Sequence, residues 1–175
     1  AGFEPLVSGF VRVPYNDMDA IRQVALHNRN VVAVLVEPIQ GEGGVRTLDI
    51  AYLQQLRQVC DEQNWLLMLD EVQCGIGRTG KWFAYQHAGI LPDVMTLAKA
   101  VCGGIAGGAL LAKPEIAPSL RPGMHAATFG GNPIAAAAGV AYIEAIEREK
   151  LLEHAKRVGD VIRQRMLELH KECGL

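Results

Sequence analysis

Apolar runs alternate with amphipathic stretches along the chain, and this alternation predicts an α/β fold. Four short apolar runs have the composition of buried strands, at residues 31–36, 65–69, 94–97 and 108–112. The first run is β-branched and continuous, as expected for a strand that is covered on both faces. Strands that alternate with helices imply a mainly parallel sheet with helices on both faces.

Helical periodicity fills two of the intervening segments. Asn16 or Asp17 can cap a helix whose apolar side chains fall on one face. Residues 49–63 carry apolar side chains at helical spacing, and residues 82–87 read as a short helix. The first of these helices precedes the first predicted strand, and the other two lie between predicted strands.

Two longer helices are predicted towards the end of the chain. Asn132 followed by Pro133 combines a capping side chain with proline at the first helical position, so a helix begins there and runs to about Glu149. A second helix extends from Leu151 towards Glu172. Its apolar stripe comprises Leu152, Ala155, Val158, Ile162, Met166 and Leu169.

Composition narrows the class of protein without deciding it. Half of the 175 residues are hydrophobic and the formal net charge is −2, which indicates a globular protein and argues against a nucleic-acid or anionic-membrane surface. No apolar run approaches the roughly 20 residues of a membrane span, and no signal peptide is visible. We therefore expect no nucleic-acid partner and no membrane association.

The metal-ligating residue types are scattered. The four cysteines form no CxxC pair, and the five histidines show no ligand spacing, so the sequence predicts no metal site. Reduced thiols in a cytoplasmic compartment are the default for such cysteines.

Polar side chains follow the apolar runs at three places. Glu37 comes directly after the first run, Asp70 after the second, and Lys99 shortly after the third. Ligands of parallel sheets gather beyond the carboxyl ends of the strands, so these side chains are expected to share one pocket. Thr128 begins a glycine-rich turn further along the chain.

These residue types suit a charged, phosphorylated ring that bears an aldehyde. A carboxylate can keep a ring nitrogen protonated, an amine can form a Schiff base, and a hydroxyl can bind a phosphate. That ring is pyridoxal phosphate. Taken singly, each residue also has an ordinary interpretation: Asp70 as a turn cap, Lys99 as a lysine extending to water, and Thr128 as part of a turn.

The segment 75–80 offers a different class of function, because it fits GxGxxG and with Lys81 nearly fits a P-loop. The P-loop requires Ser or Thr after the lysine, and here Trp82 follows. The dinucleotide fingerprint requires the glycines directly after a strand and an acid about 20 residues later, whereas Asp93 comes too early. A loop that bends over a pocket fits the segment better.

Five segments together resemble the class III pyridoxal-phosphate aminotransferases, with acetylornithine and ornithine aminotransferases as the nearest members. They are residues 36–44, 69–73, 75–80, 96–99 and 128–133. The segments occur in the order of the family and roughly at its spacing, and they span most of the chain.

The resemblance implies a role for each cofactor-binding residue. Lys99 would form the Schiff base, and Asp70 would hold the pyridine nitrogen protonated. Gln73 would hydrogen-bond the phenolic oxygen, and Val72 would pack on a ring face. Thr128 resembles the threonine that reaches the phosphate held by the other subunit, which implies a homodimer with shared active sites.

Two glutamates are implied to serve the substrate. Glu42 resembles the glutamate that pairs with a substrate-binding arginine in ornithine-type enzymes and swings aside for the second substrate. Glu37 resembles its neighbour, which supports the hydrogen bonds near Gln73. By residue type alone, Glu42 reads as a solvated turn glutamate.

The resemblance also implies the architecture. The fold would be the large domain of a fold-type I transferase, with residues 1–149 in that domain and residues 150–175 leading into a small C-terminal domain. The chain would be the middle of a longer enzyme, without the upstream phosphate loop, the ring-stacking aromatic residue and the later arginine that binds a substrate carboxylate.

The implied reaction transfers the terminal amino group of N-acetylornithine to 2-oxoglutarate, as in arginine biosynthesis. Ornithine, succinylornithine and 4-aminobutyrate are alternative amino donors. An alternative of another class is a catalytically incompetent fragment that acts only as a folded scaffold.

Overall fold

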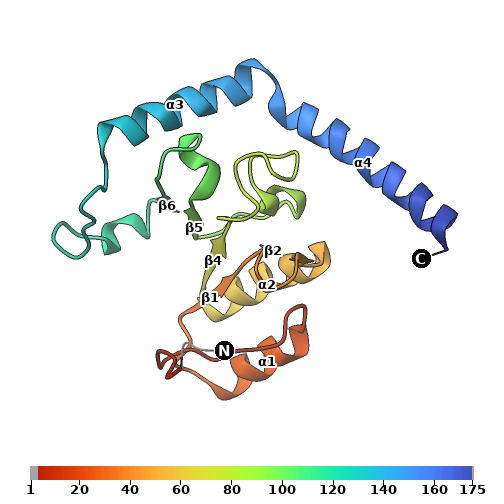
Figure 1. Cartoon of the computed structure of the whole chain (residues 1–175). Coiled ribbons are helices and arrows are strands. Elements are labelled where there is room, and N and C mark those ends of the chain that lie inside the picture. The colour runs from red at the N-terminus through yellow and green to blue at the C-terminus, as the bar shows by residue number, and fades with distance from the viewer. Residues whose placement is uncertain (1–3, 175) are drawn as a thin grey trace.

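A four-stranded sheet forms the centre of the computed structural model, which describes residues 4–174 (Figure 1). The strands are β1 (Ala33–Val36), β4 (Leu66–Asp70), β5 (Val94–Leu97) and β6 (Ala109–Ala112), in that spatial order. β1, β4 and β5 are parallel to one another, and β6 pairs with β5 in the antiparallel direction. The expected α/β fold with a mainly parallel sheet is confirmed.

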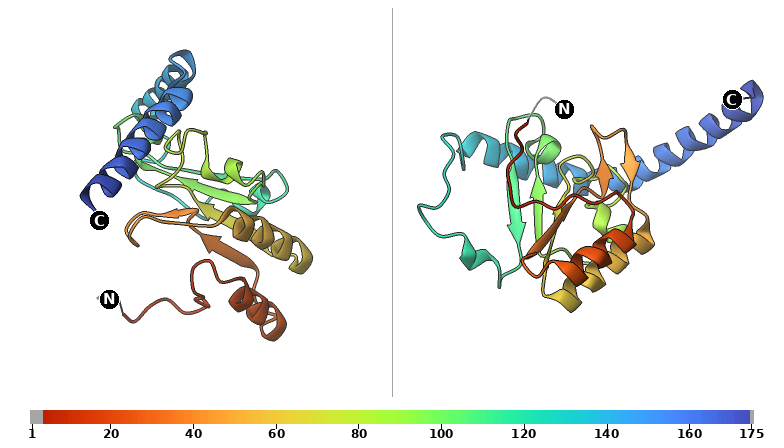
Figure 2. Two further views of the ribbon diagram at one scale, coloured as in Figure 1. Left: turned by 90° about the vertical axis from the view of Figure 1, so that its right-hand side faces the viewer. Right: turned by 90° about the horizontal axis from the view of Figure 1, so that it is seen from below.

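Helices lie on both faces of the sheet (Figures 1 and 2). α1 (Met18–His27) and α2 (Ile50–Gln63) lie on one side, and α3 (Pro133–Arg148) lies on the other. Asp17 caps α1 by accepting a hydrogen bond from the Ala20 N–H at 2.9 Å. The predicted helix starts are therefore close to those observed.

Short helical turns connect the remaining strands. η1 (Ala84–His87) and η2 (Lys99–Cys102) are single 3₁₀ turns, and η3 (Ala117–Ser119) follows β6. η2 packs against α3. The short helix predicted over residues 82–87 is thus present as η1.

A small hairpin precedes α2 and was not evident in the hydrophobic pattern. β2 (Ile39–Gln40) pairs antiparallel with β3 (Arg46–Thr47). The Tyr15 hydroxyl holds the base of this hairpin by donating to the carbonyl oxygens of Glu37 at 2.8 Å and Pro38 at 3.2 Å. Burial, followed by the charge of Glu37, raises the pKa of Tyr15 to about 12, so this hydroxyl remains a donor at neutral pH.

The two faces of the sheet have separate hydrophobic cores. The core beneath α2 contains Leu56, Leu67 and Leu69, each fully buried. The core beneath α3 contains Met95 and Leu97 of β5, with Ile76 and Ile146. Burying a leucine side chain contributes roughly 1.5–3 kcal/mol, so these positions hold the strands in register.

The expectation that residues 31–36 are covered on both faces was wrong. Val34 and Val36 pack against the core beneath α2, but Leu35 is 58% exposed. Successive side chains of a strand point to opposite faces. The face of β1 that carries Leu35 is therefore not covered within residues 4–174.

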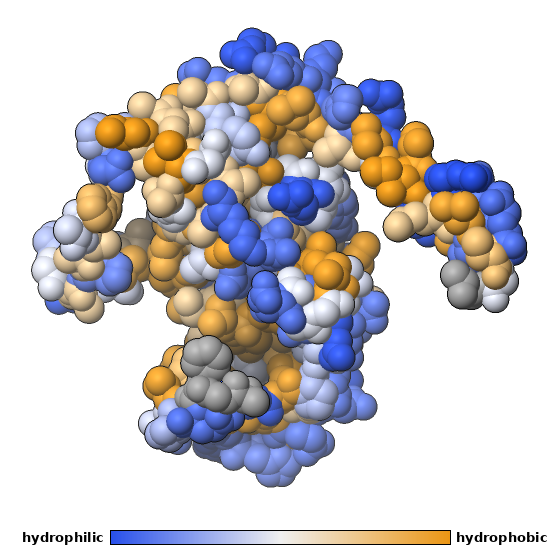
Figure 3. Space-filling view, in the orientation of Figure 1, coloured by the Kyte–Doolittle hydropathy of each residue, from blue (hydrophilic) through white to orange (hydrophobic). Residues whose placement is uncertain are grey.

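The last helix, α4 (Leu151–Cys173), runs away from the rest of the chain (Figure 1). Only its first turn, with Leu151 and Leu152, packs against the core beneath α3. Beyond Leu152, its predicted apolar stripe is exposed, with Ile162 at 54% and Met166 at 66%. Figure 3 shows hydrophobic side chains gathered along this helix. No helix within residues 4–174 combines the length and apolarity that crossing a membrane requires.

Candidate functional site

A polar pocket opens at the carboxyl ends of β4 and β5. Its volume is about 370 Å³, within the range of small-molecule sites. The lining residues are Val72, Gln73, Gly75, Arg78, Ala98, Lys99 and Ala100. Parallel strands direct their carboxyl ends to one edge of the sheet, and the pocket lies where such sheets bind ligands.

Lys99 and Gln73 meet inside this pocket. The Lys99 ammonium donates a hydrogen bond to the Gln73 side-chain oxygen, Oε1. The two residues are 26 positions apart and follow neighbouring strands. The structure therefore brings together three of the predicted cofactor-binding residues: Val72, Gln73 and Lys99.

The backbone of Lys99 has an unusual conformation. Its φ angle is +49°, in the left-handed region that residues with a side chain seldom adopt. The same residue ends the connection from β5 and begins η2. Non-glycine residues in this region cost of order 1–3 kcal/mol and cluster at functional sites.

Asp70 is the last residue of β4 and lies beside the pocket without lining it. Its Oδ1 accepts a hydrogen bond from the Val72 N–H at 3.0 Å. This bond fixes the start of the turn that carries Val72 and Gln73. Asp70 thus has the turn-capping role that its residue type predicts, and no other hydrogen bond involves its carboxylate within residues 4–174.

The β2–β3 hairpin contacts the pocket through Gly41. A Cβ atom at position 41 would lie 2.6 Å from Cδ of Gln73, so any side chain there would displace Gln73. The Glu37 carboxylate accepts a hydrogen bond from the Gly41 N–H at 3.3 Å. Glu37 is half-buried and Glu42 is exposed, and neither of them lines the pocket.

Thr128 does not meet the other predicted residues. It is exposed, in the segment that precedes α3, and does not line the pocket. The following turn ends at Asn132, whose side chain accepts a hydrogen bond from the Ala135 N–H at 2.8 Å and begins α3. The role of Thr128 stays a prediction.

The glycine-rich segment 75–80 borders the pocket through Gly75 and Arg78. It continues as turns rather than opening an α-helix, and the next helical element is η1. Dinucleotide and P-loop sites place phosphate at the N-terminus of a helix that follows the glycines directly. The nucleotide-binding interpretation lacks that helix, and the segment is a pocket loop.

Sequence reasoning missed Glu71, although it lies within one of the motifs. Glu71 is 1% exposed, and its carboxylate accepts hydrogen bonds from Cys74, Ala84 and Tyr85. The available signal was its place directly after Asp70 at the end of a buried strand. Its partners are up to 14 residues away, and hydrophobic patterning carries no information about them.

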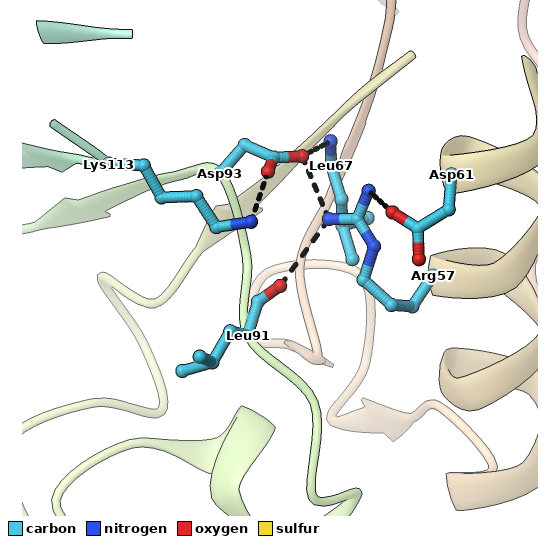
Figure 4. A network of polar contacts seen from close by, with 6 residues as sticks. All are labelled: Arg57, Asp61, Leu67, Leu91, Asp93 and Lys113. Atoms are coloured by element: carbon cyan, nitrogen blue, oxygen red, sulfur yellow. Dashed lines mark hydrogen bonds and ion pairs between the residues drawn. The ribbon is translucent and has the colours of Figure 1, made fainter. Parts of the chain in front are cut away.

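A second buried carboxylate, Asp93, lies directly before β5, at the end of the strand opposite to the pocket, and Figure 4 shows its polar contacts. Asp93 pairs with Arg57 at 2.8 Å and Lys113 at 2.7 Å, and it accepts the Leu67 N–H at 2.7 Å. Arg57 also pairs with Asp61 at 2.7 Å. Burial would raise the pKa of Asp93, but the hydrogen bonds from Lys113, Leu67 and Arg57 outweigh it and hold the pKa below its usual value. This network joins α2 to β4, β5 and β6, and it is structural.

Comparison with known proteins identifies the family. Residues 1–173 match the family model described as aminotransferase class-III. The chain is 55% identical over 160 residues to acetylornithine aminotransferase of Nitrosomonas europaea, covering 91% of this chain and 41% of that protein. It is 58% identical over 158 residues to acetylornithine aminotransferase 1 of Bordetella pertussis, covering 90% of this chain and 40% of that protein.

Solved structures agree in fold. A crystal structure of acetylornithine aminotransferase from Elizabethkingia anophelis superposes with a TM-score of 0.90 at 41% identity, covering 95% of this chain and 44% of that one. Ornithine aminotransferase from Toxoplasma gondii, described with partial occupancy of PLP at its active site, gives a TM-score of 0.90 at 37% identity, covering 98% and 39%. The chain thus spans about two fifths of the length of these relatives. Because the family model matches nearly the whole length of this chain, the chain belongs to the class-III aminotransferases.

Proposed function

We propose that this chain is part of an enzyme that transfers the terminal amino group of N-acetylornithine to 2-oxoglutarate with pyridoxal phosphate as cofactor. The observation that carries the proposal is the meeting of the Lys99 amine and the Gln73 amide in a polar pocket at the carboxyl ends of β4 and β5. The choice of amino donor is supported by the relatives that are 55–58% identical, which are acetylornithine aminotransferases.

The residues of the pocket fit the cofactor in chemistry and size. The pocket volume of about 370 Å³ accommodates a small ring, and its lining offers an amine, an amide and the apolar side chain of Val72. When bound, pyridoxal phosphate supplies an electron sink for the carbanion formed at the substrate carbon.

Each residue then has a defined task. Lys99 is the residue that would hold the cofactor through its aldehyde, and its amine would move a proton at the substrate carbon. Asp70 keeps the pyridine nitrogen protonated through a charge-assisted hydrogen bond. Gln73 binds the phenolic oxygen, and Val72 packs on one ring face.

The substrate side of the site involves the hairpin. Glu42 at its tip pairs with a substrate-binding arginine and moves aside for the diacid acceptor, while Glu37 supports the hairpin next to Gln73. The enzyme acts as a cytoplasmic homodimer in which Thr128 reaches the phosphate bound by the partner subunit. The four cysteines, which are free in the described residues, are consistent with a reducing compartment.

A substrate panel tests this function. The full-length enzyme that contains this chain, loaded with pyridoxal phosphate, is offered N-acetylornithine, ornithine, succinylornithine or 4-aminobutyrate, each with 2-oxoglutarate, and glutamate formation is measured. We expect the highest kcat/KM for N-acetylornithine. A preference for another donor overturns the substrate assignment, and the absence of cofactor absorbance leaves only the scaffold alternative.

A further inference from the structure

The most deeply buried charged side chain of residues 4–174 has no task in the proposed reaction. Glu71 is 1% exposed and accepts hydrogen bonds from the Ala84 N–H at 2.8 Å, the Tyr85 N–H at 2.9 Å and the Cys74 thiol at 3.3 Å. An unpaired buried charge is strongly unfavourable, so three donors on one carboxylate indicate a built arrangement.

All three donors are neutral. No salt bridge of the described residues includes Glu71. The carboxylate is acceptor-only when ionised, and each of its oxygens faces a backbone N–H. Burial and then the nearby charge of Glu71 raise the pKa of Cys74, so that thiol keeps the proton it donates.

The backbone of Glu71 is also hydrogen-bonded, both to the sheet and to the turn that follows. Its N–H donates to the Thr96 carbonyl oxygen of β5 at 3.0 Å, and its own carbonyl oxygen accepts the Gly75 N–H at 2.8 Å. Glu71 therefore starts the turn that presents Val72 and Gln73 to the pocket. Its side chain reaches across to the first residues of η1, where the loop 75–83 ends.

We propose that Glu71 is a positioning residue whose buried carboxylate fastens loop 75–83 and η1 to the Val72–Gln73 turn, and so holds Gln73 at Lys99. This inference rests on the proposed function for its catalytic consequence, but not for its structural one. Without the carboxylate, the N–H groups of Ala84 and Tyr85 lose their acceptor in a buried place.

The isosteric variant Glu71→Gln keeps the shape of the side chain but removes its charge and one of its two acceptor oxygens. Its amide has one acceptor oxygen, so its NH₂ group must face either Ala84 N–H or Tyr85 N–H, donor against donor. A matched control is Asp93→Asn, which alters the other buried carboxylate at the opposite end of the same strands. Both variants weaken the fold, but only Glu71→Gln alters the pocket.

Limited trypsin digestion of the cofactor-free protein measures how often loop 75–83 opens, because the cleavage sites Arg78 and Lys81 lie within it. We expect Glu71→Gln to be cleaved at these two residues at least about tenfold faster than the wild type, in excess of any change at Arg22 of α1, whereas Asp93→Asn should change the cleavage rates at all three residues alike. The same ratio of loop cleavage to α1 cleavage in the two variants overturns the proposal.

Cofactor titration and kinetics give the second readout. Glu71→Gln should raise the dissociation constant of pyridoxal phosphate about tenfold and lower kcat, while KM for the amino donor changes less than about threefold. If Glu71→Gln does not fold, Glu71→Asp replaces it, because the shorter side chain keeps the charge but cannot reach both N–H groups. A full-length wild-type enzyme that binds no cofactor overturns the proposed function, and the trypsin comparison still decides the role of Glu71.

Discussion

Gly41 lies against the side chain of Gln73 so closely that no Cβ fits between them. The three nearest side-chain atoms of Gln73 would be 2.6–2.9 Å from a Cβ at position 41. Gln73 in turn accepts the hydrogen bond of Lys99. The position of the β2–β3 hairpin is therefore transmitted to the lysine through one amide side chain.

Gly41→Ala should displace Gln73 from Lys99 and weaken cofactor binding. We expect about a tenfold higher dissociation constant for pyridoxal phosphate, which corresponds to about 1.4 kcal/mol. Fluorescence titration with the cofactor measures it. The control is Gly159→Ala in α4, where a Cβ meets nothing within 4 Å. Wild-type affinity in Gly41→Ala would show that the hairpin and Gln73 are not coupled.

Lys99→Ala should abolish the covalent link to the cofactor and lower the transfer rate by about 10³-fold or more. Reduction with borohydride followed by mass spectrometry detects the link in the wild type alone. Lys171→Ala, which removes an exposed amine from α4, should behave as the wild type. Normal turnover of Lys99→Ala would remove Lys99 from the mechanism.

Two substitutions separate the turn-capping role of Asp70 from its charge. Asp70→Asn keeps an oxygen for the Val72 N–H, so the turn should survive, whereas Asp70→Ala removes the acceptor. We expect Asp70→Asn to bind cofactor but to slow single-turnover proton transfer about 10²-fold or more. Asp70→Ala should also bind cofactor more weakly. A single-turnover rate in Asp70→Asn equal to that of the wild type contradicts the electrostatic role.

The Asp93 network should make stability depend on pH in the acid range. Because the folded pKa of Asp93 lies below its unfolded value of 3.8, the stabilisation is full above that value and is lost as pH falls through the folded pKa. Asp93→Asn should lower the free energy of unfolding by about 3 kcal/mol at pH 7, because it removes the ion pairs of Asp93 with Lys113 and with Arg57, which keeps only Asp61. Urea unfolding at pH 7 and pH 3 should show this difference narrowing at pH 3. A difference that does not change with pH contradicts the shift.

The exposed stripe of α4 should make the 175-residue chain associate. Ile162 and Met166 present apolar surface over successive turns, and contiguous exposed apolar surface favours association. Size-exclusion chromatography with light scattering should show oligomers, and Met166→Lys should reduce them. Gln164→Lys introduces the same charge at a polar position and should not. A monodisperse wild-type monomer would contradict this expectation.

Much of the sheet could be predicted from the sequence, because short continuous apolar runs indicate buried strands. β5 occupies residues 94–97 as predicted, and α3 begins at Pro133 after its Asn132 cap. The direction of β6 could not be predicted, because an apolar run does not indicate whether its strand pairs in the parallel or the antiparallel direction. Its antiparallel pairing follows from a connection that holds only the single turn η2 and no crossover helix.

The candidate site was predictable in composition but only in part in arrangement. The contact between Lys99 and Gln73 follows from two neighbouring strand ends. The hairpin was missed because its strands have two residues each and depend on the distant Tyr15 hydroxyl. Glu71 was missed because its donors belong to a 3₁₀ turn 13–14 residues further along the chain.

Under the role proposed for Lys99, its left-handed backbone sets stability against activity at a single position. Glycine adopts φ of +49° without the strain that a lysine bears, so Lys99→Gly relieves the backbone while removing the amine. Selection for thermal robustness alone would favour that replacement, whereas selection for turnover opposes it. Stability-guided engineering of this protein must therefore hold position 99 fixed, because the substitution that improves the melting temperature there would discard the chemistry.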